Sequence, residues 1–293
     1  MSTSSYYVPE QSRWPIIASL SLGLLAYGAG MTFNAMSAGG SSIGPYILGA
    51  GFLVLFYVIF GWFRDVISES QGGLYSEQMD RSFRQGMLWF IFSEVMFFAA
   101  FFGALFYVRT FSVPWLGGEG EKGVTNMLWE GFQATWPLMV TPDPAQFEGP
   151  KELVDPWHLP LLNTVLLISS SVTITIAHHA LKEGHRKKLE LWLAATIVLA
   201  IAFLYFQVVE YIEAYTHLGL TLQSGIYGAT FFMLTGFHGF HVTLGTIILF
   251  VMLLRIFDGD FTPKQHFAFE AAAWYWHFVD VVWVGLFIFV YIL

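Results

Sequence analysis

Five ionisable side chains interrupt apolar stretches of this sequence. His238 and His241 stand one helical turn apart in the segment GFHGFH, and His277 and Asp280 stand one turn apart in the segment WYWHFVDVVW. Glu270 precedes His277 by a spacing of about two turns. Residues at these spacings share one face of a helix. The sequence therefore predicts two helix faces that carry imidazole and carboxylate groups.

Imidazole and carboxylate groups on neighbouring helices could bind a metal ion or could bind one another. Histidine is the commonest metal ligand in proteins, and the two pairs together would supply four ligands. Against a metal site, Gly236 and Gly239 favour close helix packing, in which histidines form hydrogen bonds between helices. We interpret the five ionisable residues as a polar network that holds helices together. We expect no metal ligand and no catalytic residue in this chain.

Glu94 is a further carboxylic acid with bulky apolar neighbours, in the segment FIFSEVMFF. A charged group at the centre of a bilayer costs at least about 2.5–3.5 kcal/mol, so such residues face other helices or water and are candidates for function. Two roles remain open for Glu94. It is either a neutral acid that is hydrogen-bonded to a neighbouring helix, or a group that accepts or senses protons.

The elements that position these groups are membrane helices. The chain has 293 residues, of which 56% are hydrophobic and 12% are charged, whereas a soluble protein has about 25% charged residues. A helix needs about 20 apolar residues to cross a bilayer. Seven stretches of the sequence qualify, at 14–36, 45–62, 86–108, 159–177, 191–209, 225–254 and 271–293.

These stretches predict an all-α integral membrane protein with a single membrane domain over 1–293. The first two helices fall within 1–70, and the other five within 83–293 together with an acidic external loop over 111–157. Orientation follows from the excess of Lys and Arg in cytoplasmic loops. A cytoplasmic N-terminus places ten of the 13 Lys and Arg residues inside. We therefore expect the C-terminus to face the periplasm.

Composition excludes several classes of function. The chain has no cysteine, which excludes disulfides, thiolate metal sites and cysteine nucleophiles. Its net charge of −8 argues against nucleic acid as a partner, because phosphate binding needs clustered Lys and Arg.

Six sequence blocks together resemble the subunit III family of haem–copper cytochrome c oxidases, of the bacterial type. They occur in the order found in that family and cover most of the chain outside 111–157. The blocks are WFRDVISES (62–70), FIFSEVMFF around Glu94, LPLLNT (159–164), AHHALKEGHRK (177–187), YGATFFMLTGFHGFHVTLG (227–245) and HFAFEAAAWYWHFVDVVW (266–283).

This resemblance implies an accessory subunit of a proton-pumping oxidase of the aerobic respiratory chain. It implies a V-shaped bundle, in which the first two helices splay from the other five around a cleft that holds phospholipid. The expected partners are the catalytic subunit I and subunit II, which hold the haem and copper, with cytochrome c as the electron donor to the complex. The expected location is the bacterial inner membrane.

The resemblance also implies roles for single residues. Trp62, Phe63 and Arg64 would line the lipid cleft, and Arg255 would bind a lipid phosphate. A cation at a helix C-terminus is physically suited to that role. Glu94 corresponds to the membrane-embedded carboxylate of the family that reacts with a hydrophobic carbodiimide. Support of proton uptake is a further expected role, through the cytoplasmic groups Asp65, Glu69, Asp80, His185 and His266.

Two alternatives stay open at the level of the sequence. A subunit of a quinol-oxidising haem–copper oxidase is one, although such subunits typically resemble only the last five helices. A proton-coupled transporter that uses Glu94 and the paired histidines is the other. Transporters often contain inverted repeats and broken helices, and the sequence indicates neither.

Overall fold

The computed structural model describes Tyr7 and residues 11–293, apart from the side chains of residues 121–123. Residues 1–6 and 8–10, which include the N-terminus that the sequence predicts to be cytoplasmic, lie outside the described residues. The described part is helical and contains no strand. It divides into two compact units, Met1–Phe83 and Arg84–Leu293.

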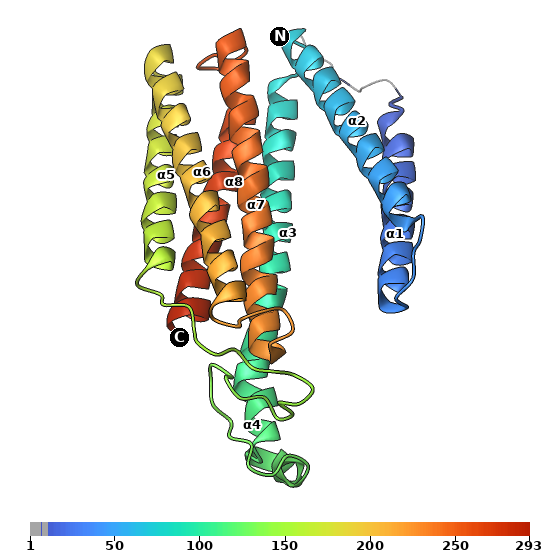
Figure 1. Cartoon of the computed structure of the whole chain (residues 1–293). Helices are drawn as coiled ribbons and strands as arrows, with labels where there is room; N and C mark the ends of the chain where they lie inside the picture. Colours follow the sequence, from blue (N-terminus) through green and yellow to red (C-terminus); the bar gives the residue numbers. More distant parts are fainter. Residues whose placement is uncertain (1–6, 8–10) are drawn as a thin grey trace. The chain divides into compact units, whose positions relative to one another are not determined.

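The first unit is a helical hairpin of α1 (Trp14–Ser37) and α2 (Gly44–Gln71), drawn in blue in Figure 1. Proline stands in the first turn of both helices, where its missing N–H costs nothing. The two helices approach closely because glycines line their interface. A Cβ atom on Gly28 would lie 2.4 Å from the backbone nitrogen of Leu48, and one on Gly44 would lie 2.6 Å from that of Thr32.

The second unit contains five long helices that run alongside one another (Figure 1). Its first helix is α3 (Glu77–Tyr107), which begins in the first unit and continues through a π-helical turn, η1 (Val108–Ser112), into the short α4 (Val113–Leu116). The segment between α4 and α5 contains the 3₁₀ turn η2 (Gly120–Met127). The remaining elements are α5 (Leu159–Lys182), α6 (Arg186–Thr216), α7 (Gly225–Asp258), α8 (Phe267–Leu286) and the π-helical end η3 (Phe287–Ile292).

Helix α8 is the central element of the second unit. It packs against α5 and α7, and four of its large side chains, Phe269, Trp276, Trp283 and Leu286, are fully buried. Helix α3 contacts α7 and α8 through bulky aromatic side chains: the ring of Phe97 lies 5.0 Å from that of Phe237, between centroids.

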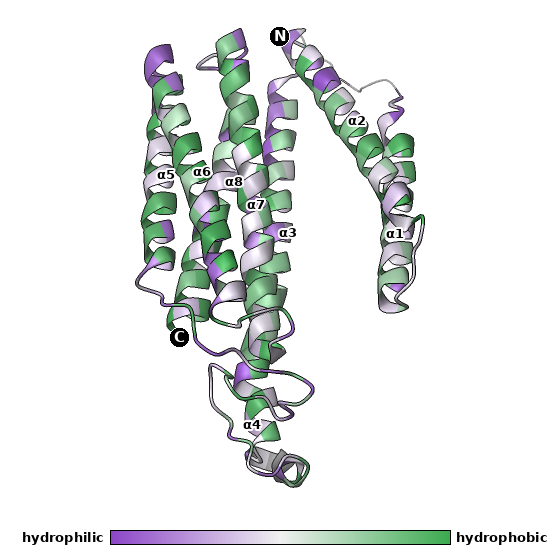
Figure 2. Ribbon diagram, viewed as in Figure 1, coloured by the Kyte–Doolittle hydropathy of each residue, from purple (hydrophilic) through white to green (hydrophobic). Residues whose placement is uncertain are grey.

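In the part of the chain that the structure describes, seven helices are long and apolar enough to cross a membrane, as the sequence predicts. All but the last extend to or beyond the predicted end, and α2 continues to Gln71, nine residues past Trp62. The last helical segment ends at Ile292, one residue before the predicted end. Figure 2 shows why: the apolar residues fill the middle of the helices, and hydrophilic residues gather near their ends. Hydropathy detects only the part of a helix that suits hydrocarbon, whereas the backbone remains helical in the polar region.

The external loop was predicted to begin at residue 111, and this starting point was wrong. The chain stays helical through Leu116, so that the loop begins after residue 116 and not at 111. Bulky residues sustain the helix there, since the rings of Phe111 and Trp115 contact each other at 5.6 Å. A glycine pair, Gly117 and Gly118, follows, and Gly118 adopts a positive φ of 88°, which favours glycine and ends the helix.

The close approach of α1 and α2 predicts a contrast between two glycines on the same helix. Gly28→Ala should lower the free energy of unfolding by about 1–3 kcal/mol, because the new methyl group collides with backbone atoms of α2. Gly30→Ala is the matched control, since nothing lies within 4 Å of its Cβ position. Thermal unfolding of the detergent-solubilised protein measures both variants, and equal stability of the two would contradict the glycine-lined interface.

Candidate functional site

Glu94 and His241 form a contact between α3 and α7 within the hydrophobic part of the second unit. The Oε2 atom of Glu94 lies 2.8 Å from Nε2 of His241. The imidazole is nearly buried, with 9% of its side chain exposed, and Glu94 is 22% exposed. The ring of Phe98 packs edge-on against the imidazole at 4.9 Å. Glu94, for which the sequence left two roles open, is thus bound to a neighbouring helix.

The second nitrogen of His241 constrains the protons of this pair. Nδ1 lies 2.6 Å from the carbonyl oxygen of Phe237. Because a carbonyl oxygen only accepts, Nδ1 carries hydrogen and donates it. A single further proton then lies between Nε2 of His241 and the carboxyl group of Glu94. With that proton on either side, the pair as a whole is electrically neutral, which suits a low-dielectric environment.

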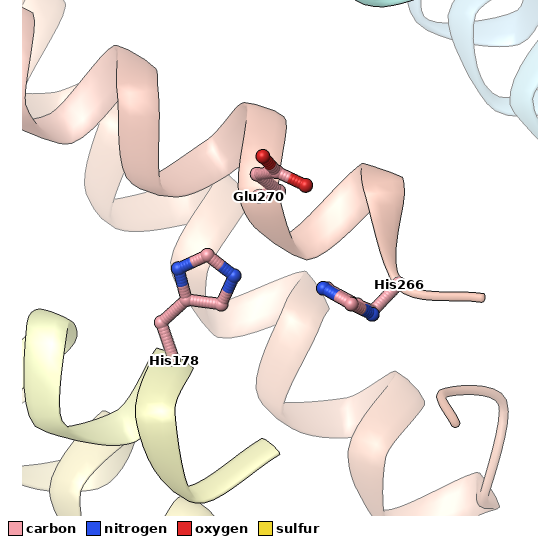
Figure 3. A group of neighbouring side chains, drawn as sticks. All are labelled: His178, His266 and Glu270. Carbon is pink, nitrogen blue, oxygen red and sulfur yellow. The ribbon is translucent and has the colours of Figure 1, made fainter. Parts of the chain in front are cut away.

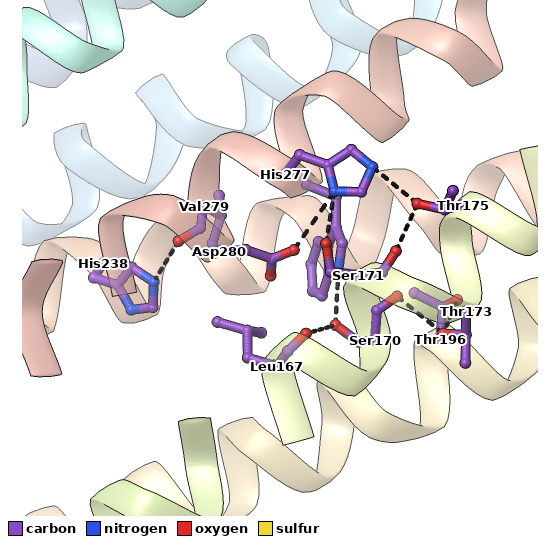
Figure 4. Close-up of polar contacts among 11 residues, drawn as sticks. Leu167, Ser170, Ser171, Thr173, Thr175, Thr196, His238, His277, Val279 and Asp280 are labelled. Carbon is purple, nitrogen blue, oxygen red and sulfur yellow. Dashed lines mark hydrogen bonds and ion pairs between the residues drawn. The ribbon is translucent and has the colours of Figure 1, made fainter. Parts of the chain in front are cut away.

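His277 and Asp280 form a second polar group, between α8 and α5 (Figure 4). Nδ1 of His277 lies 2.7 Å from the hydroxyl oxygen of Ser171 and 3.7 Å from Oδ2 of Asp280. The other ring nitrogen, Nε2, lies 3.4 Å from the hydroxyl oxygen of Thr175. Asp280 is 7% exposed, and neither of its buried carboxyl oxygens has a hydrogen-bond partner.

Hydroxyl groups of α5 also bind two of the three indole rings of α8. The Nε1–H of Trp276 donates to the hydroxyl oxygen of Ser170, and that of Trp283 donates to Thr164, each at 2.9 Å. Both tryptophans are fully buried. A buried indole N–H needs an acceptor, which explains why α5 is rich in Ser and Thr.

His238 is bound separately from the other predicted members of the network. Its Nε2 atom lies 3.2 Å from the backbone carbonyl oxygen of Val279 on α8 (Figure 4). The imidazole is 1% exposed, and its ring packs against that of Trp283 at 5.1 Å. Because the carbonyl oxygen only accepts, Nε2 of His238 is the protonated nitrogen.

The predicted network is therefore several separate contacts between helices. His241 pairs with Glu94, whereas His277 pairs with Ser171 and Asp280. The four-ligand metal set that the sequence left open does not assemble among the described residues, where only one other group of three ligands converges.

That converging group consists of His178, His266 and Glu270. Glu270 forms an ion pair with Arg84, whose Nη1 atom lies 2.7 Å from Oε2 of the carboxylate. The sequence connects Glu270 only with His277, and it predicts His266 only as a cytoplasmic group. Because His178 belongs to α5 and the other two belong to the beginning of α8, no spacing in the sequence connects them.

A second group that sequence reasoning missed lies at the other end of the unit. The hydroxyl of Tyr291 donates to Oε1 of Glu210 at 2.6 Å, and the amide of Gln207 donates to the same oxygen at 3.1 Å. Glu210 is 1% exposed. The predicted apolar stretch ends one residue before Glu210, so that hydropathy excluded it.

The residues expected to bind lipid lie in both units. In the first, Trp62 and Phe63 are more than half exposed, and their rings stack at 5.8 Å; Arg64 is also exposed. In the second unit, Arg255 contacts two other side chains of this protein. Its Nε atom lies 2.9 Å from Asp260, and its guanidinium lies 4.6 Å above the ring of Phe261.

Two acids expected to collect protons accept hydrogen bonds from aromatic side chains of the first unit. The indole Nε1–H of Trp14 donates to Asp65 at 2.7 Å, and the hydroxyl of Tyr75 donates to Glu69 at 2.8 Å. Tyr75 lies between α2 and α3. Burial raises the pKa of this phenol, and the hydrogen bond to Glu69 raises the pKa further.

Comparison with known proteins identifies the family. The sequence pattern described as "Cytochrome c oxidase subunit III" matches residues 4–121 and 136–293. The chain is 40% identical to cytochrome c oxidase subunit 3 of Prototheca wickerhamii, over 99% of this chain and 98% of that protein. It is 41% identical to the subunit of Marchantia polymorpha, over 98% of this chain and 95% of that protein.

The similarity reaches animal proteins as well. The chain is 39% identical to cytochrome c oxidase subunit 3 of Oryctolagus cuniculus, over 99% of this chain and 97% of that protein. These matches confirm the resemblance predicted from the sequence blocks. With its seven apolar helices, the chain belongs to the cytochrome c oxidase subunit III family and is a multi-pass membrane subunit of that oxidase.

Proposed function

We propose that this chain is a non-catalytic subunit that stabilises the catalytic subunit I of a proton-pumping cytochrome c oxidase and binds structural phospholipid. Family membership over nearly the full length carries the proposal. Subunit II is a further partner, and cytochrome c is the electron donor to the complex. The haem and copper belong to these partner subunits, with phospholipid as the ligand of this chain.

The side chains of the second unit support a structural role. Two of its membrane-embedded ionisable groups are bound to neighbouring helices: Glu94 to His241, and His277 to Ser171. Groups that fix helices to one another are expected in a subunit that presents a rigid face to its partner. The first two helices, which quinol-type subunits typically lack, favour the cytochrome c type over the quinol type.

The proposed location is the bacterial inner membrane, with the N-terminus in the cytoplasm and the C-terminus in the periplasm. The distribution of Lys and Arg supports this orientation. Arg186, one of the cations assigned to the cytoplasmic side, lies at the C-terminal end of α7, where its guanidinium donates to carbonyl oxygens at 2.6 Å from Ile256 and 3.0 Å from Phe257.

Affinity purification tests the proposed function. A tagged chain that is extracted in mild detergent should copurify with a haem-bearing subunit and should confer cytochrome c oxidation on the eluate. The absorption spectrum of the eluate and its subunit list measure the outcome. A chain that purifies intact but alone, without haem, would contradict the proposal and would favour a transporter.

The proposed lipid site predicts different effects for the two members of one ion pair. Arg255→Ala should lower the phospholipid content of the purified protein, because the cation that binds phosphate is lost. Asp260→Asn is the matched control, since it breaks the same ion pair but keeps the cation. Native mass spectrometry measures bound lipid. Equal retention in the wild type and Arg255→Ala, or equal loss in both variants, would contradict a phosphate contact.

The Glu94–His241 pair predicts opposite results for two substitutions of one residue. Glu94→Gln should leave assembly intact, because the amide N–H can donate to Nε2 of His241 and so keep a hydrogen bond between the two side chains. Glu94→Ala leaves that buried nitrogen without a partner, which should cost about 1–3 kcal/mol. Gel filtration and thermal unfolding of the complex measure both variants. Loss of the complex in Glu94→Gln would show that the acidic proton itself is required.

A further inference from the structure

We propose that His178, His266 and Glu270 form a binding site for a divalent transition-metal ion such as Zn²⁺, and that the metal displaces Arg84 from Glu270. Each of the three side chains offers one ligand atom, and these atoms all lie within 4.8 Å of one another. Figure 3 shows His178 on α5 facing His266 and Glu270, which come from the beginning of α8. The site is distinct from the Glu94–His241 and His277–Asp280 pairs.

Two buried nitrogen atoms make this group more than a cluster of ionisable residues. Nε2 of His178 and Nδ1 of His266 are buried, and neither has a hydrogen-bond partner. The centroids of the two rings are 5.5 Å apart. An unsatisfied polar atom in a protein interior is costly, and a metal ion is a partner that would satisfy both imidazoles at once.

The ligand set selects the class of metal. Two imidazole nitrogens and one glutamate oxygen suit Zn²⁺, which binds nitrogen at about 2.0–2.1 Å in a tetrahedral geometry. Ligand atoms of such a site lie about 3.3 Å apart. Side-chain rotations that move the ligand atoms by about 1 Å would therefore close the site around the ion. Mg²⁺ and Ca²⁺ prefer sites made of oxygen atoms and should not compete. Water would complete the coordination.

Arg84 now supplies the positive charge that neutralises Glu270. The two side chains are 33% and 15% exposed, respectively, and Nη1 of Arg84 lies 2.7 Å from the carboxylate. The guanidinium also lies 5.1 Å above the ring of Phe267. A metal ion at Glu270 would repel this cation, so that metal binding and the ion pair between α3 and α8 oppose each other. Such linkage is reciprocal: weakening one interaction strengthens the other.

Zinc binding to the purified protein tests the site. The detergent-extracted chain, with its copurifying subunits, is stripped by a chelator and dialysed against ZnCl₂, and atomic emission measures bound zinc. His178→Gln and His266→Gln should each weaken one zinc site at least about 100-fold, since even indirect partners of a metal ligand contribute 10–100-fold. His179→Gln, an exposed neighbour on α5, is the matched control and should bind as the wild type does.

Two histidine variants are used because either one alone could fail to fold, which gel filtration reveals. Equal zinc content in the wild type and in a folded His178 or His266 variant would overturn the site. X-ray absorption at the zinc edge of the wild type, measured as the difference from the His178→Gln protein, should show two imidazole ligands. A difference spectrum without imidazole would also overturn it.

The displacement of Arg84 predicts an effect in the opposite direction. Arg84→Gln should bind zinc about threefold to tenfold more tightly than the wild type, since a competing cation of a partly exposed ion pair is removed. Glu270→Gln should bind more weakly. Zinc affinity that is unchanged or reduced in a folded Arg84→Gln protein would refute the displacement.

Discussion

Hydrocarbon offers no water to hydrogen-bond a polar side chain, and the structure of the second unit depends on that constraint. Polar groups that enter the membrane must bind other parts of the protein. Trp276 and Trp283 form hydrogen bonds to hydroxyl groups of α5, and His238 forms one to a backbone carbonyl of α8. The same contacts decide which helix faces meet, because an apolar surface alone would pack equally well against lipid.

This constraint also connects the fold with the role of the chain in its oxidase. Glu94 and His241 share one proton within a neutral pair, and they join α3 to a bundle that it also contacts through aromatic rings and through the Arg84–Glu270 ion pair. Such a pair can exchange a proton, but its geometry is that of a hydrogen bond that holds α3 and α7 together. A subunit that holds its own helices rigidly is suited to support a neighbouring catalytic subunit.

Hydropathy predicted all seven helices, because the membrane imposes a length and a composition on each of them. It could not predict their ends, since residues such as Arg186 and Lys182 continue a helix in water. Pairing of polar side chains was predicted only for residues on the same helix, such as His277 and Asp280. The partners Glu94 and His241 lie 147 residues apart, and which helices are neighbours is a property of packing. For the same reason the convergence of His178 with Glu270 escaped the sequence.

A double-mutant cycle on Thr164 and Trp283 tests the central claim most directly, because both side chains are buried. Thr164→Val removes the hydroxyl group with little change in shape. Trp283→Phe removes the N–H and also leaves a cavity, whose cost occurs in the single and the double variant and so cancels in the coupling energy. Thermal unfolding of the purified protein would measure the wild type, both single variants and the double variant. The account predicts a favourable coupling energy of about 0.6–1.7 kcal/mol, the range found for hydrogen bonds between membrane helices. A coupling energy of zero would mean that polar contacts between α5 and α8 do not hold the bundle together.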